Sequence, residues 1–189
     1  HMIDFLEMSV NYASFMFLCI LQQEVATSPQ LQDALIAFVN KVDNKRPLSF
    51  GDWINDLLNP LLLAAHKQKV DHPLVRSFLD NLFDHRSNIL LGNKKEASVV
   101  QLRNEYRGHS TTRSDAIYHD VCLQLLSRVE RMADAFLPLA CCEVSIVKGS
   151  YTIDFTPIGK SQKIELYPFI YLGEQDHIYL FQSLKDEQT

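Results

Sequence analysis

The segment VVQLRNEYRGHS, residues Val99–Ser110, carries the main signal for the fold of this chain. Val99, Leu102 and Tyr106 are spaced at i, i+3 and i+7, which predicts an apolar stripe along one side of a helix. Gly108 follows, and glycine can adopt the left-handed conformation that ends a helix and turns the chain back. The segment therefore predicts a helix that stops at a sharp turn.

Three polar residues of this segment form a motif at the predicted helix end. Asn104 directly follows Arg103, and His109 comes six positions after Arg103. If Gly108 turns the chain back, Arg103 and His109 can share one pocket wall. This arrangement resembles the HEPN superfamily of small helical nucleic-acid-processing domains. The motif of that family is an arginine, a polar residue directly after it and a histidine four to six positions beyond the arginine.

The resemblance implies a metal-independent endoribonuclease in which the ribose 2'-hydroxyl attacks its own phosphodiester. His109 would be the general acid or base, because it is the only side chain of the motif that exchanges a proton near neutral pH. Arg103 would stabilise the charge that builds on the phosphate oxygens. Asn104 would orient His109 or the phosphate. No cofactor or metal is expected, and a homodimer is expected, since HEPN sites are usually completed across a two-fold axis.

A second interpretation of the same residues is equally open. Arg103 can pair with Glu105 or Glu96 near the surface, and His109 can be a helix-end residue stabilised by the helix dipole. The resemblance then implies a non-catalytic HEPN-like dimerisation or sensor module of a larger signalling or defence protein. In that interpretation the C-terminal part of the chain carries the partner contact.

The charge of the chain limits how it can bind nucleic acid. Its 189 residues carry a formal net charge of -5, which argues against a protein that coats nucleic acid generally. Between Lys94 and Arg113, however, five basic and two acidic residues leave a local charge of +3. We therefore predict local RNA binding by the four basic residues around Arg103, namely Lys94, Lys95, Arg107 and Arg113.

The cysteines and the apolar runs favour a cytoplasmic protein that does not span a membrane. The four cysteines fit neither a CxxC zinc pair nor a disulfide framework, which predicts reduced thiols: Cys19, Cys122, Cys141 and Cys142. The most apolar run, Met8–Leu21, has 14 residues with polar interruptions, whereas a membrane span needs about 20. Asp4 and Glu7 precede this run in place of basic residues, so a signal peptide is not expected.

Residues 3–137 are predicted to form a HEPN-like antiparallel helical bundle, and His1-Met2 resembles a cloning remnant. The predicted helices cover residues 3–26, 28–42, 49–65 with a kink or break at Pro60, 72–82, 95–107 and 114–136. The first helix has one apolar face, formed by Phe5, Met8, Tyr12, Phe15 and Cys19. Its run Phe15–Leu21 is apolar on nearly all sides, so we expect a second copy of the chain, or the C-terminal sheet, to cover its outer side.

The helix predicted over 114–136 has the most regular pattern of the chain. Its expected core stripe is Tyr118, Cys122, Leu125, Val129, Met132 and Phe136. Leu102 and Tyr106 of the motif helix are expected to be buried against the Cys122 and Leu125 part of this stripe. Four other histidines are isolated in sequence and are expected to be solvated: His66, His72, His85 and His177.

After Pro138 the pattern changes from helical to alternating, which predicts an antiparallel β appendage over residues 138–185. Glu143–Ile146 and Tyr151–Phe155 read as two strands of a hairpin around a Gly149-Ser150 turn. Two further strands are expected within 163–172 and 177–181. The charged residues 185–187 are typical of either a chain end or a linker, and a linker would lead to further domains C-terminal to this chain.

Overall fold

The computed structural model describes residues 1–24, 48–84, 87–107, 115–147 and 150–166, together with residues 29, 32–33, 36 and 40. Helices predominate and a small three-stranded antiparallel sheet follows them, which confirms the predicted mainly α fold class with a C-terminal β appendage. The chain divides into two compact units, residues 1–141 and 142–189. Most of the helix predicted over 28–42, the strand predicted over 177–181 and the end of the one before it lie outside the described residues.

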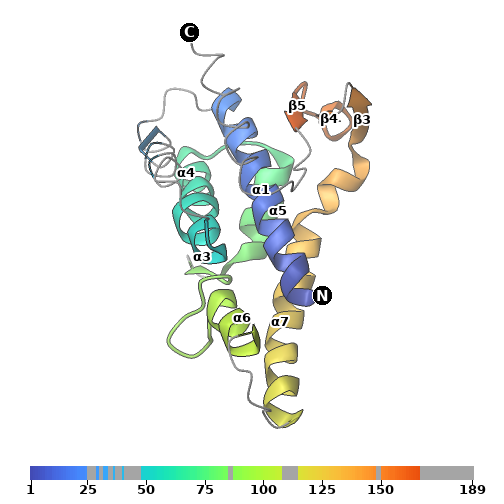
Figure 1. Cartoon of the computed structure of the whole chain (residues 1–189). Coiled ribbons are helices and arrows are strands. Elements are labelled where there is room, and N and C mark those ends of the chain that lie inside the picture. The colour runs from blue at the N-terminus through green and yellow to red at the C-terminus, as the bar shows by residue number, and fades with distance from the viewer. Residues whose placement is uncertain are drawn as a thin grey trace. The chain divides into compact units, whose positions relative to one another are not determined.

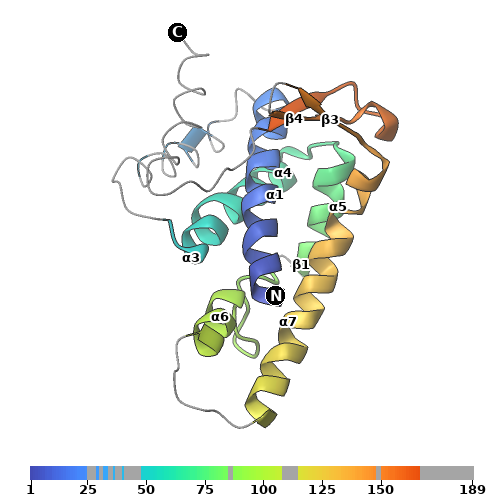
Figure 2. The same cartoon turned by 45° about the vertical axis from the view of Figure 1, so that its right-hand side comes forward.

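Unit 1 is built around α1, Met2–Glu24. The other helical elements follow in chain order: α3 Phe50–Asp52, the π-helix η1 Trp53–Leu58, α4 Asn59–Gln68, α5 Pro73–Leu82, α6 Val99–Arg107, α7 Asp115–Ala135 and the 3-10 helix η2 Leu137–Cys141. The two-residue strands β1 Phe83–Asp84 and β2 Ser87–Asn88 pair between α5 and α6. Figures 1 and 2 show α1 alongside α4 and α7, and α5 packs against α7 and α4.

Aromatic rings join α1, α5 and the C-terminal end of α7. Phe78 of α5 packs edge-on against Phe17 of α1 at 4.8 Å and against Phe136 at 4.9 Å. Tyr12 lies 6.3 Å from Phe136 between ring centroids. Edge-to-face pairs of this kind contribute about 0.5–1.5 kcal/mol each beyond the area they bury. These contacts hold α1, α5 and α7 together at the end of α7.

The apolar run of α1 is covered within a single chain. Six of the seven residues from Phe15 to Leu21 are buried, so a second copy of the chain is not needed to cover them. The exposed part of α1 is instead the N-terminal part of its predicted apolar face, where Phe5 and Tyr12 are partly exposed and Met8 is 73% exposed. Within the described residues, one stretch, Met2–Leu21, is long and apolar enough to cross a membrane, and 61% of its most apolar window is buried in the chain.

The helix predicted from Ser49 onward begins with a capping box. The backbone N–H of Asp52 donates to Ser49 Oγ at 3.2 Å, and the Ser49 N–H donates to Asp52 Oδ2 at 2.8 Å. The helical residues continue without a break from Phe50 to Gln68. A π-helical turn precedes Pro60, and in it the Asn59 N–H donates to the Ile54 carbonyl. The wider turn accommodates a proline, which has no N–H and crowds the preceding turn of a regular helix.

His72 does not have the solvated environment that we predicted. It is completely buried, and its Nδ1 accepts a hydrogen bond of 3.2 Å from the Leu74 N–H. His72 therefore occupies the N-cap of α5, with Pro73 as the first helical residue, a role that serine or aspartate fills more often. His66 is exposed, as predicted, whereas His85 and His177 lie outside the described residues.

The buried line of α7 is rotated from the predicted stripe. Leu125 and Met132 are buried, but the other four predicted positions, at 118, 122, 129 and 136, are only partly buried. Val121, Arg128 and Ala135 take their places in the core. The side of α7 that faces the other helices thus contains an arginine.

Unit 2 contains the sheet β3 Glu143–Val147, β4 Ser150–Asp154 and β5 Lys163–Leu166, in the order β3-β4-β5. Val144, Ile153 and Ile164 form one row across it, and the latter two are buried. The predicted pairing of β3 and β4 is confirmed, but the predicted Gly149-Ser150 turn is wrong, because Ser150 belongs to β4 and pairs with Val147. On the other face, hydrogen bonds from Thr156 and from Lys163, whose Nζ lies 2.9 Å from the carboxylate, lower the pKa of Asp154 to about 2.

Candidate functional site

The motif helix α6 packs antiparallel to the first half of α7. Tyr106, near the end of α6, meets Tyr118, near the start of α7, whereas Ala97, before α6, contacts Arg128 further along α7. Leu102 is buried, as predicted. The predicted burial of Tyr106 is wrong, because this side chain is 51% exposed. Tyr106 lies at the end of α6, and its ring packs edge-on against the ring of Tyr118, with 6.0 Å between the ring centroids.

Arg103 is held by a residue of α1. Its Nε lies 2.6 Å from Glu7 Oε1, and both side chains are partly buried, with 33% of Arg103 and 24% of Glu7 exposed. Its Nη1 lies 3.4 Å from the side-chain oxygen of Asn104, which is the longer and weaker contact. Arg103 thus forms an ion pair, but with Glu7 in place of the predicted Glu105 or Glu96. The first two residues of the motif are in contact with each other, and Arg103 lies next to α1.

The third residue of the motif lies outside the described part of the chain. His109 belongs to residues 108–114, which the structure does not describe, and so does the predicted RNA-binding residue Arg113. Arg107 is the last residue of α6, and only its backbone is described. The predicted proximity of Arg103 and His109 therefore stays a prediction.

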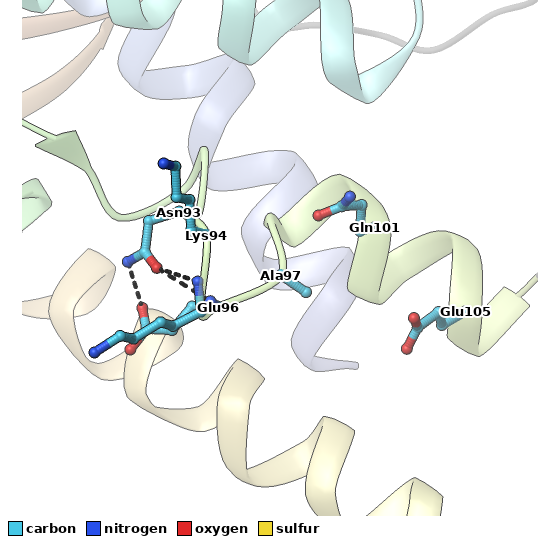
Figure 3. Close-up of a pocket in the computed structure, with 7 residues that line it drawn as sticks. Asn93, Lys94, Glu96, Ala97, Gln101 and Glu105 are labelled. Atoms are coloured by element: carbon cyan, nitrogen blue, oxygen red, sulfur yellow. Dashed lines mark hydrogen bonds between the residues drawn. The ribbon is translucent and has the colours of Figure 1, made fainter.

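The predicted RNA-binding residues Lys94 and Lys95 line a shallow hollow of about 290 Å³ beside α6. Figure 3 shows a loop, residues 93–97, on one side of this hollow and Gln101 and Glu105 of α6 on the other. Both lysines are exposed. Because Glu96 and Glu105 also line the hollow, its two positive charges face two negative ones. Such a balanced site gives little general attraction for phosphate.

The hollow and Arg103 lie on different sides of α6. Gln101 and Glu105 are each two positions from Arg103, and a two-residue step turns about 200° around a helix. Arg103 faces α1, whereas Gln101 and Glu105 face the loop. The structure therefore separates the two predicted RNA-binding lysines from the predicted catalytic arginine.

Residues 93–97 belong to a longer loop, residues 89–98, between β2 and α6, and Arg128 holds this loop. Arg128 belongs to neither the predicted site nor the predicted core stripe of its helix. Only 7% of the Arg128 side chain is exposed, and its guanidinium donates to the carbonyls of Ala97 at 2.9 Å, Gln124 at 2.7 Å and Ile89 at 3.3 Å. Burial lowers the pKa of Arg128, and the nearby carboxylate of Glu96, 3.8 Å away, opposes this shift. The arginine thus connects α7 to both ends of the loop.

No metal-binding group was found in the described ranges: they contain no cluster of three or more histidine, cysteine, aspartate or glutamate side chains that could hold an ion. Comparison of the chain with protein families, with curated proteins and with solved structures finds no match. The argument for a function therefore depends on the chemistry of the residues around Arg103.

Proposed function

We propose that this chain is a HEPN-like endoribonuclease that cleaves RNA by attack of the 2'-hydroxyl, without a metal ion. The observation that supports this proposal is the setting of Arg103. Its Nε is bound to Glu7, its Nη1 is next to Asn104, and one third of its side chain is exposed. The guanidinium therefore has a fixed orientation and an accessible part, near the end of the helix that leads to His109.

In the proposed reaction, Arg103 binds the scissile phosphate. A guanidinium has five N–H donors in a rigid plane, and the two contacts with Glu7 and Asn104 use two of them. The other donors can contact two phosphate oxygens and stabilise the charge that grows as the 2'-oxygen attacks. His109 removes the proton from the 2'-hydroxyl or gives one to the leaving 5'-oxygen.

Each chain supplies one motif histidine, whereas this reaction benefits from both an acid and a base. A second His109, brought by a two-fold axis, would fill the other role. The proposed enzyme is therefore a homodimer in which two copies of Arg103 and His109 meet.

We expect Arg103→Ala and His109→Ala each to lower the rate of RNA cleavage at least about 100-fold. Thermal unfolding should change little for His109→Ala, and a chelator should not affect the wild-type rate. The measurement is cleavage of a labelled single-stranded RNA, with the cyclic phosphate product identified by mass spectrometry. Arg76→Ala is a matched control, because Arg76 forms an exposed ion pair with Asp71 at 2.7 Å. Full cleavage by both motif variants would reject the proposed site.

A second candidate function, a non-catalytic dimerisation or sensor module, is favoured by the exposed face of α1. Phe5, Met8 and Tyr12 are spaced at i, i+3 and i+7 and are all partly or largely exposed, although the rest of this helix forms the core of unit 1. An apolar stripe of this kind on a core helix is typical of a surface that binds protein. In this function the pair of Arg103 and Glu7 serves only to join α6 to α1.

The proposed enzyme and the dimerisation module both predict a dimer, and the α1 stripe supplies a variant that tests it. We expect the wild-type chain to be a dimer at micromolar concentration and Met8→Gln to weaken the dimer at least about tenfold, because Met8 is the most exposed residue of the stripe. Sedimentation equilibrium measures both values. Leu63→Gln is the control, since Leu63 is an exposed apolar residue of α4. A wild-type chain that sediments as a monomer would exclude the shared site and the dimerisation module alike.

A further inference from the structure

We infer that Glu7 of α1 is a positioning residue for the proposed reaction, which fixes the guanidinium of Arg103 against the phosphate. This inference rests on the proposed function and adds to the motif a residue that lies 96 positions before Arg103 in the sequence. Glu7 itself touches neither the RNA nor the reacting atoms in this role. It acts through the orientation of Arg103.

The contact is directional, because the carboxylate meets the Nε edge of the guanidinium. Nε is the donor nearest the aliphatic stem, so a strong bond there fixes the plane of the whole group. At 2.6 Å, the bond between Glu7 Oε1 and Arg103 Nε is short even for a charge-assisted hydrogen bond. It leaves the distal Nη side of Arg103 to meet a ligand.

Glu7 also has a rigid base. Its neighbours Leu6 and Val10 are completely or almost completely buried in the core of unit 1, so the backbone that carries Glu7 is firmly held. A long arginine side chain loses rotamer entropy whenever it binds a phosphate, and a carboxylate that holds it beforehand removes part of that loss. In metal sites, outer-shell residues that orient a ligand change activity about 10- to 100-fold when removed, and we expect an effect of similar size for Glu7.

The negative charge of Glu7 is unfavourable for RNA binding, in contrast to its effect on the orientation of Arg103. It partly offsets the positive charge of Arg103, which lowers the general attraction for RNA. An RNA phosphodiester carries a single negative charge. Its binding to Arg103 then depends on the orientation of the guanidinium N–H groups more than on the net charge of the site. Removal of Glu7 should therefore lower the rate of cleavage but change RNA affinity less, because the loss of orientation and the loss of negative charge affect affinity in opposite directions.

The experiment is a double-mutant cycle of Glu7→Ala and Arg103→Ala in the full chain. The probe is a fluorescently labelled single-stranded RNA oligonucleotide of mixed sequence, with cleavage rate at saturation and Kd measured separately. We expect Glu7→Ala to lower the maximal rate about 10- to 100-fold, with a smaller change in Kd. In the Arg103→Ala background the same change should have no further effect. Glu7→Gln, which keeps an oxygen acceptor for Nε, should recover part of the rate.

Asp4→Ala is the matched control, because Asp4 is a carboxylate one turn earlier on α1 that lies 3.2 Å from the N-terminal amine. An equal loss from Glu7→Ala with and without Arg103, or a faster rate after Glu7→Ala, would overturn the positioning role while the cleavage itself remains. A wild-type chain that does not cleave the RNA would overturn the proposed function and, with it, the role of Glu7. Thermal unfolding of each variant separates loss of fold from loss of orientation.

Discussion

Arg128→Ala is expected to lower the free energy of unfolding of unit 1 by about 3–5 kcal/mol. The guanidinium is buried and donates to the carbonyls of Ala97, Gln124 and Ile89. Its removal leaves acceptors at both ends of the loop without their donor, and it leaves a cavity on the core side of α7. The loss should therefore exceed that of an ordinary surface arginine by several kcal/mol.

Two further substitutions at this position separate charge from hydrogen bonding. Arg128→Lys keeps the positive charge near Glu96, but an ammonium cannot reproduce the planar fork that contacts three separated carbonyls, so most of the loss should remain. Arg128→Met fills the space and should lose less than alanine. Urea unfolding followed by circular dichroism gives these values, with Arg131→Ala as the control, because Arg131 is an arginine of the same helix three positions later. A loss below about 1 kcal/mol for Arg128→Ala would contradict the structural role assigned to it.

The elements that could be predicted from the sequence are those with local signals. Ser49 with Asp52 is a capping pair, Pro73 is a helix start, and the alternation in residues 143–155 is a hairpin pattern. Each of these signals acts within a few residues of the chain. For this reason these two helix starts and the paired strands agree with the prediction, whereas α6 begins at Val99, four residues after its predicted start at 95.

The contacts that escaped prediction depend on residues far apart in the sequence. The non-catalytic interpretation pairs Arg103 with a glutamate of its own region, but Glu7, 96 positions away, reaches it because α1 packs next to α6. Similarly, Arg128 is an internal residue only because the loop before α6 offers carbonyls to it. A signal for Arg128 did exist: it lies three residues after Leu125 and four before Met132, which is the spacing of a core position.

The candidate site could be predicted only in part, because local patterns in the sequence do not determine the contacts between distant residues. The burial of Leu102 follows from the helical period, whereas the exposure of Tyr106 depends on where α7 begins. The period also fixes that Gln101 and Glu105 lie on the opposite side of α6 from Arg103. The prediction that Lys94 and Lys95 bind RNA together with Arg103 depends on the net charge of this sequence segment. Net charge does not show on which side of the helix each residue lies.

Gly92→Ala is expected to lower the free energy of unfolding by about 2–4 kcal/mol, because the site combines backbone strain with steric overlap. Gly92 has a φ of 69°, and an added Cβ would lie 2.5 Å from the Glu96 carbonyl oxygen and 2.6 Å from the Ser98 nitrogen. Both neighbours are backbone atoms of the loop that Arg128 holds at Ala97, so neither can move without disturbing the start of α6.

Gly159→Ala is the control for this substitution, since Gly159 has a φ of 86° but no atom within 4 Å of an added Cβ. Gly159→Ala should lower the free energy of unfolding only by the cost of a non-glycine residue in the left-handed conformation, about 1–2 kcal/mol. The comparison is made by urea unfolding, and hydrogen exchange of the α6 amides follows the effect on the motif helix. If Gly92→Ala loses no more stability than Gly159→Ala, the loop adapts to the added methyl group, and the close packing of residues 92–98 is not what holds Lys94 and Lys95 beside α6.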